Sequence, residues 1–245
     1  MKIPIICYHK VEKHNKNKPY PNSFISPFQF RLQIFLLKIL GYKSINQEDL
    51  LYFLHKKKLN IKKPIIIMFD DGYKNTFTNA YPVLKKAGFT AIISICANFV
   101  GKKNATFENG EDIKGKIGED FLTSEDIIYM SQNNIFFCSH GVNHYRLDTL
   151  SEDNLLNELI LSKQFLEKLI NKKVNFFTYP WGVYNDLIIR YLINAGYLGA
   201  FSTRRGKVYE GNNPYELKRL MINGYSRKFN FLSTISFLYK LFFFN

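Results

Sequence analysis

The sequence predicts an α/β fold, a distorted TIM-like barrel of parallel strands with seven or eight β/α units. Two observations lead to this prediction. Short continuous runs of apolar, β-branched and aromatic residues alternate with longer segments of helical periodicity, as in parallel strands buried under helices. About eight such units follow one another in 245 residues without a linker or a repeat, which favours a closed barrel over an open sheet.

The candidate strands are apolar runs bounded by polar or turn-forming residues. The first begins close to the N-terminus, and its apolar run is shorter than the core of a signal peptide. The strands are predicted at 3–8, 64–69, 90–95, 135–139, 175–179, 199–203 and 217–222, with a weaker one at 42–45.

Helices are predicted between these strands from their start and stop signals. Ser26 and Pro27 provide an N-cap and a first-turn proline before the apolar segment 28–40, and Gly41 follows as a stop. Two further helices are predicted over 152–170 and 185–196, and the polar stretch 101–120 is predicted to be a surface insertion.

The formal net charge of +14 suggests anionic partners, but the basic residues are scattered, and the densest run is 55–63. Scattered charge favours a solvated surface. We expect no nucleic-acid partner, because the chain has neither a recognised binding motif nor a concentrated basic stripe.

The cysteines indicate a reducing compartment. Each lies inside an apolar run, and an odd number with irregular spacing does not form a disulfide framework. No run of about 20 apolar residues suggests a membrane span. We therefore expect a cytoplasmic protein, at most peripheral at the inner membrane face. The three cysteines are Cys7, Cys96 and Cys138.

Polar residues stand directly after several predicted strands. The carboxyl ends of parallel strands meet on one rim of a barrel, where active sites are built. Five separate segments are therefore expected to meet there. They contribute His9, Asp70 with Asp71, His140, the segment 180–182, and Arg204 with Arg205.

His140 and His144, four residues apart, can converge on a metal. With one carboxylate they form a two-histidine, one-carboxylate set that leaves positions open for water and substrate. Such spacing alone is typical of surface histidines, and Asp70-Asp71 alone is typical of a strand-end turn. Their joint occurrence after two strands favours a metal site.

Three motifs resemble those of the polysaccharide deacetylases of carbohydrate esterase family 4, the NodB-homology fold. They are "MFDDG" (68–72), "HGVNH" (140–144) and "TYPWG" (178–182). The chain is most similar to the poly-N-acetylglucosamine deacetylase group, which begins with a strand ending in Tyr-His. The resemblance covers roughly residues 3–225 and implies a deacetylase domain over 1–228.

The resemblance implies a role for each matching residue. Asp71, His140 and His144 would hold a divalent metal, with Zn²⁺ as first choice and Co²⁺, Ni²⁺, Mn²⁺ or Fe²⁺ as alternatives. Asp70 would be the general base for a metal-activated water. The backbone N–H of Trp181 would help to hold the oxyanion.

The leaving amine needs a proton donor, for which a histidine is suitable. Most family members use an L-x-H motif near the C-terminus, but this chain has no histidine after His144. The resemblance to the Tyr-His group implies that His9 is the acid. His14, in a polar loop, and His55, in a lysine run, stay as alternatives, and His9 could instead be a buried structural residue.

Aromatic residues beside this constellation suggest sugar binding, because an exposed ring can stack on a pyranose face. The alternative for 179–182 is an aromatic turn at the barrel rim, with or without a cis proline. The alternative for Arg204 and Arg205 is that they face solvent or a phosphate and do not bind the sugar. The expected substrate-binding residues are Tyr73, Tyr179, Pro180, Trp181 and Arg204.

The chain departs from the family pattern at two positions. Gly141 stands where the family has a Ser or Thr that braces the metal loop. Thr178 stands where an arginine usually orients the base aspartate, a change shared with the most similar group.

Arg219 lies inside an apolar strand pattern, and we expect it to pair with a rim carboxylate.

We therefore predict a metal-dependent hydrolase that removes the N-acetyl group from an N-acetylhexosamine in a glycan or a lipid-linked saccharide. Its setting would be bacterial surface-polysaccharide biosynthesis. The alternatives are an O-acetyl carbohydrate esterase on the same scaffold and a non-catalytic glycan-binding relative.

The segment 229–245 has apolar residues at helical spacing and is too short to span a bilayer. It is predicted to be a last helix packed on the barrel. In the alternative it lies in the interface of an anionic membrane, helped by positive charge.

Overall fold

The structure is a computed structural model that describes residues 1–13, 15, 17, 23–107, 117–222, 237–239 and 241–242. Seven parallel strands close into a barrel, which confirms the predicted fold class. In order around the ring they are β2 (Ile5–Tyr8), β12 (Leu217–Met221), β10 (Gly199–Arg205), β9 (Phe176–Thr178), β8 (Ile135–Ser139), β7 (Ala91–Ile95) and β6 (Pro64–Phe69), which pairs back with β2.

Short strands complete the described sheets. The weak strand predicted at 42–45 is present as β5 (Lys43–Ser44), and it pairs with β6 outside the ring. The remaining short strands form two pairs, β1 (Lys2–Ile3) with β11 (Val208–Tyr209) and β3 (Lys10–Val11) with β4 (Phe24–Ile25).

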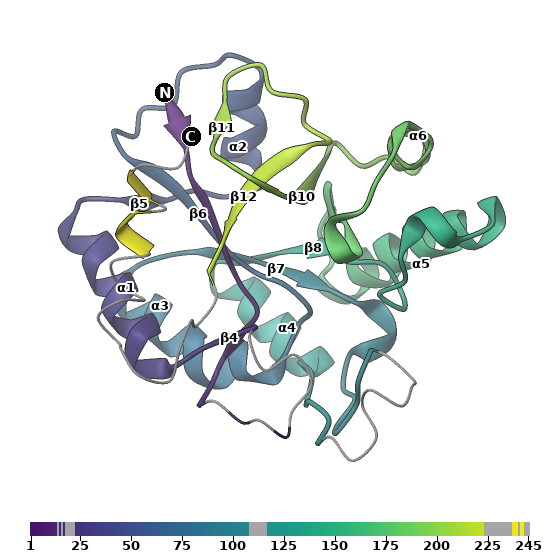
Figure 1. Cartoon of the computed structure of the whole chain (residues 1–245), viewed down its shortest axis with the longest axis horizontal. Helices are drawn as coiled ribbons and strands as arrows, with labels where there is room; N and C mark the ends of the chain where they lie inside the picture. The colour runs from purple at the N-terminus through teal and green to yellow at the C-terminus, as the bar shows by residue number, and fades with distance from the viewer. Residues whose placement is uncertain are drawn as a thin grey trace.

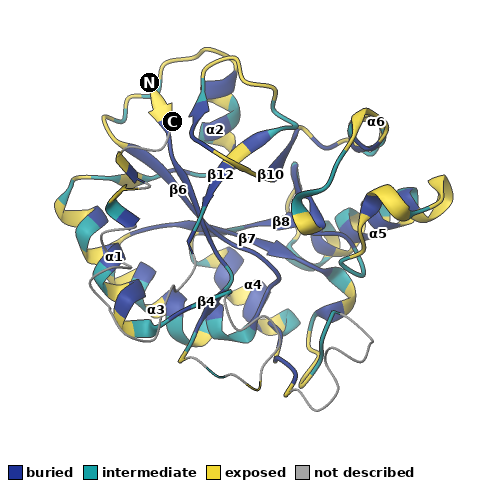
Figure 2. Ribbon diagram, in the orientation of Figure 1, coloured by how far each residue is buried: buried dark blue, intermediate teal, exposed yellow. Residues whose placement is uncertain are grey.

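Helices surround the strands in Figure 1, and in Figure 2 their buried faces alternate with exposed ones while the strands are mostly buried. The three predicted helices are present, and α1 begins at the predicted cap Ser26. The helices are α1 (Pro27–Ile39), α2 (Gln47–Leu54), α3 (Tyr81–Ala87), α4 (Ser124–Gln132), α5 (Glu152–Ile170) and α6 (Asp186–Asn194).

Most residues on both faces of the barrel strands are buried, which explains their largely apolar sequence. Along β6, Ile66 and Met68 join one core cluster, which also contains Phe53 of α2. Ile65 and Ile67 point the other way and join the larger cluster with residues of the surrounding helices. The three cysteines are buried and unpaired, as the sequence predicts.

Part of the C-terminal segment 229–245 lies outside the described residues. Phe237 and Leu241, which are described, are helical and buried in the larger core cluster. Their burial favours packing on the barrel for these residues, and contact with a membrane stays a prediction. None of the helices in the described ranges is long and apolar enough to cross a bilayer.

The polar insertion 101–120 is described at its two ends. Ala105 and Glu119 form an antiparallel bridge between them. Glu119 is buried, and its carboxylate accepts a hydrogen bond from Lys10 Nζ at 3.0 Å. The second end of this segment is thus anchored to Lys10 of β3, the residue after His9, and is not simply a surface loop.

Candidate active site

A cavity of about 230 Å³ opens where the carboxyl ends of the barrel strands meet. A larger hollow of about 540 Å³ lies among Met1, Lys58 and Glu210, but no histidine lines it. The smaller cavity carries the candidate chemistry. It is lined by His9, Ser23, Asp70, Asp71, Phe107, His140, His144, Tyr179, Trp181, Thr203 and Arg219.

The two neighbouring aspartates at the end of β6 point their carboxylates at different partners. The Asp70 N–H still donates to Tyr8 O across the sheet, at 2.9 Å. Asp71 has a left-handed backbone with φ of 75°, which turns the chain away from the strand. Such a conformation costs a non-glycine residue about 1–3 kcal/mol and persists where surrounding contacts enforce it. Both side chains are buried.

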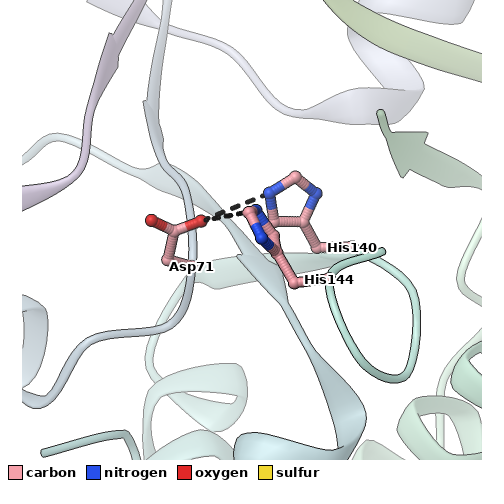
Figure 3. A group of neighbouring side chains, drawn as sticks. All are labelled: Asp71, His140 and His144. Atoms are coloured by element: carbon pink, nitrogen blue, oxygen red, sulfur yellow. Dashed lines mark ion pairs between the residues drawn. The ribbon is translucent and has the colours of Figure 1, made fainter. Parts of the chain in front are cut away.

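Asp71 lies against the two histidines of the loop after β8, and the three side chains point toward one another in Figure 3. Its Oδ1 is 3.3 Å from His140 Nε2 and 3.5 Å from His144 Nε2. Three protein ligands that leave further positions open are the pattern of a catalytic metal site.

The hydrogen bonding of His140 supports the fit to a metal. Its Nδ1 is 2.7 Å from Thr178 O, and because a carbonyl only accepts, Nδ1 carries the proton. In the neutral ring, the Nε2 lone pair then faces the Asp71 carboxylate. Two lone pairs at this distance repel unless a cation or a proton lies between them. A metal ligand is typically oriented in this way through its other nitrogen.

The pKa values of Asp71 and His144 favour the forms that bind metal. Burial would raise the pKa of Asp71, but the hydrogen bond and charge of the histidines lower it to about 2. Burial lowers the pKa of His144 to about 4, so this ring is neutral at pH 7. Burial also opposes a proton on His140, but Asp71 and Asp70 outweigh it and raise that pKa. A metal would compete with this proton.

Asp70 is held by a different set of groups. Arg219 Nη1 donates to its Oδ1 at 2.8 Å, and Ser94 Oγ donates to the same atom at 3.0 Å. This ion pair confirms the expectation that Arg219 pairs with a rim carboxylate. Burial raises the pKa of Asp70, but the charge and hydrogen bond of Arg219, together with the charges of His140 and His9, outweigh burial and hold this pKa well below its usual value. Asp70 is therefore ionised and able to accept a proton.

Three further residues predicted for the site, His9, Tyr179 and Trp181, also line the cavity. His9 follows β2 directly, and its buried Nδ1 has no hydrogen-bond partner within the described residues. Trp181 is 45% exposed, and its ring centroid is 5.4 Å from that of His144. Tyr179 lines the cavity too, but it is buried and its hydroxyl donates to Tyr215 O.

Three residues expected to bind substrate do not line this cavity. Tyr73 is buried, with its ring centroid 5.2 Å from that of Phe121. Pro180 is buried in the short turn after β9, and every described peptide bond is trans. The Arg204 guanidinium is exposed, pairs with Glu216 at 3.4 Å, and lies over a tyrosine ring. Packing and surface pairing occupy these three side chains.

One alternative acid, His55, does not line this cavity and is exposed at the end of α2. The other, His14, lies outside the described residues. Sequence reasoning missed Phe107, whose ring stacks on that of His144 with centroids 4.2 Å apart. Phe107 lies in the polar stretch 101–120, where no motif or strand pattern marks it as a site residue.

A parallel barrel with carboxylates and histidines gathered on one rim is an arrangement that suits hydrolytic chemistry. The sequence model of the polysaccharide deacetylase family matches residues 57–200, more than half of the chain. The chain therefore belongs to the polysaccharide deacetylase family, and it is an enzyme that deacetylates polysaccharide.

The relatives support this assignment. The chain is 29% identical over 235 residues to a poly-β-1,6-N-acetyl-D-glucosamine N-deacetylase of Staphylococcus aureus, covering 88% of this chain and 77% of the relative. A Streptococcus pyogenes deacetylase solved with acetate is 26% identical, with a TM-score of 0.80, over 92% of this chain and 94% of that one. A Bacillus cereus polysaccharide deacetylase is 26% identical, with a TM-score of 0.76, and the match covers 96% of this chain and 69% of that one.

Proposed function

We propose that this chain is a metal-dependent N-deacetylase of an N-acetylhexosamine in a glycan or lipid-linked saccharide of surface-polysaccharide biosynthesis. The observation that carries the proposal is the division of the two adjacent aspartates. Asp71 joins His140 and His144 in a set of three converging ligand atoms, whereas Asp70 is held apart by Arg219. The Staphylococcus aureus relative, named for its N-acetylglucosamine polymer, supports the sugar class.

Asp71, His140 and His144 would hold the metal, with Zn²⁺ as first choice. Such an ion supplies Lewis acidity toward a carbonyl and lowers the pKa of water. The ionised carboxylate of Asp70 would take the proton from the attacking water. His9 would donate a proton to the amine as the amide C–N bond breaks, so that acetate and a free amino sugar leave.

Trp181 contributes in two ways to this proposal. Its backbone follows the buried Pro180 and turns through a left-handed conformation, with φ of 61°. Its N–H would stabilise the developing oxyanion. Its exposed indole, beside the His144 ring, would stack on the sugar. We also propose a reducing compartment, because Cys7, Cys96 and Cys138 are all buried free thiols.

The test measures acetate release from N-acetylglucosamine oligomers and from O-acetylated saccharides, before and after chelation and after Zn²⁺ is restored. We expect release from the N-acetyl substrates that is lost on chelation and recovered with Zn²⁺. Release only from O-acetyl groups would favour the esterase alternative. Glycan binding without any release would favour the non-catalytic one.

His9→Ala is expected to lower kcat by about 10²–10⁴, the usual contribution of a positioned acid or base, without changing the bound metal. The measurement is acetate release together with metal content after dialysis. His55→Ala is the matched control, since this histidine is exposed at the end of α2. If His9→Ala retained full kcat, another donor would have to be the acid.

A further inference from the structure

We infer that Glu158 is a positioning residue for the metal site: its buried carboxylate holds the loop between His140 and His144 in the shape that brings both rings to Asp71. The inference rests on the proposed function, because it assumes that these rings bind a metal. Glu158 itself lies on α5, and it touches neither the cavity lining nor the ligand atoms in any described contact.

The Glu158 carboxylate accepts hydrogen bonds from the residues between the two histidines. Its Oε2 accepts from Val142 N at 2.7 Å and from Asn143 N at 3.0 Å. Its Oε1 accepts from Asn143 N at 3.2 Å and from Asn143 Nδ2 at 2.6 Å. Both oxygens therefore act only as acceptors. The side chain is 4% exposed, so solvent does not replace these bonds readily.

The opposite edge of the same loop is held by the turn after β7. Ala97 N donates to Gly141 O and Asn98 N donates to Val142 O, both at 3.0 Å. The loop is thus held by its N–H groups on one side and by its carbonyls on the other. His144, at its end, has a left-handed backbone with φ of 61°. A strained conformation of this kind persists when flanking contacts define it from both sides.

Gly141 fits this arrangement, because the Glu158 carboxylate occupies the space where a side chain would be. The backbone φ at Gly141 is 80°, and a Cβ there would lie 2.7 Å from Glu158 Oε2. The departure at position 141 therefore does not leave the loop unsupported. The support comes from α5, 17 residues further along the chain than Gly141.

The test is Zn²⁺ affinity, measured by calorimetric titration of the metal-free full chain at a temperature where circular dichroism shows every variant folded. Glu158→Gln preserves size, but in either orientation its NH₂ group faces a loop N–H. We expect Zn²⁺ binding about tenfold to hundredfold weaker, the usual effect of changing a group that orients metal ligands. Tight Zn²⁺ binding by Glu158→Gln would overturn the inference.

Glu167→Gln is the matched control on the same helix. Its Oε1 also accepts a backbone hydrogen bond, from Val174 N at 3.0 Å, but Val174 lies outside the metal loop. We expect it to lower stability without weakening Zn²⁺ binding. Equal weakening in the Glu158 and Glu167 variants would mean a purely structural role and would also overturn the inference. If the wild-type chain bound no Zn²⁺, the proposed function would be the part that fails.

A double-mutant cycle tests the relation between Gly141 and Glu158. Gly141→Ala introduces both backbone strain and the close contact with Oε2. In a Glu158→Ala background the close contact is gone and only the strain is left. We expect Gly141→Ala to weaken Zn²⁺ binding by a larger factor in the wild-type background than in Glu158→Ala. Equal factors in the two backgrounds would contradict the proposed coupling.

Discussion

Asp71→Asn is expected to lose both bound metal and acetate release, whereas Asp70→Asn is expected to keep the metal and lose acetate release. The reason is the geometry at the end of β6. Only Asp71 contacts the two histidines, and only Asp70 contacts Arg219. An amide in place of Asp71 removes the negative ligand. An amide in place of Asp70 leaves the ligand set complete but removes the proton acceptor.

The measurement is metal content by mass spectrometry alongside acetate release, on protein shown to be folded. Asp186→Asn is a suitable control, because this exposed aspartate lies in the first turn of α6. It should match the wild type in both readouts. Equal metal content in the Asp70 and Asp71 variants, with activity retained in both, would contradict the division of roles.

Arg219→Met is expected to lower the free energy of unfolding by about 3–5 kcal/mol, because it leaves Asp70 buried without its cation. Arg219 is completely buried, and Asp70 is 3% exposed. The double variant Asp70→Asn/Arg219→Met is expected to lose less free energy of unfolding than the two single variants lose together. A buried charge without its partner is the costly state, and the double variant has none.

Urea denaturation of the four proteins in this cycle gives the interaction free energy. Arg204→Met is the matched control, since its guanidinium is exposed and its pair with Glu216 is worth at most about 1 kcal/mol. If the Arg219 and Arg204 variants lost the same stability, the buried pair would not have the importance that we assign to it.

The same ion pair predicts the direction of a pH effect. The pKa of Asp70 is lower in the folded chain than in the unfolded chain, so its stabilising contribution is complete above the unfolded pKa of about 3.9. This contribution is lost as pH falls through the folded pKa. In Arg219→Met the largest charge that opposes burial is gone and only those of His140 and His9 are left, so the pKa of Asp70 rises. The acidic limb of the pH–activity profile should then move to higher pH, which a pH series of acetate release would detect.

The barrel could be predicted because each of its strands is a local pattern. The runs 64–69 and 135–139 coincide with β6 and β8, since a strand buried on both faces is apolar throughout. The helices α2, α3 and α4 were not predicted. They are short, with seven to nine residues each, and the pattern in so few residues is weak.

The site was predictable where one segment carries a whole motif. Asp70-Asp71 and His140 with His144 each follow one strand, so the barrel alone brings them to the same rim. Tyr73 is different, because its ring turns into a buried aromatic cluster. Which way a side chain points after a turn depends on contacts with distant residues, and the sequence pattern does not contain these.

Neighbouring residues were enough to predict the fold class, the family and the candidate ligands, because strand periodicity and short motifs are local patterns. The groups that hold the base aspartate and the metal loop in place could be found only from contacts between distant segments. Arg219 reaches Asp70 across 149 residues of chain, and Glu158 reaches the metal loop from α5. Burial then decides the strength of these contacts, because a charge removed from water must be matched by a partner.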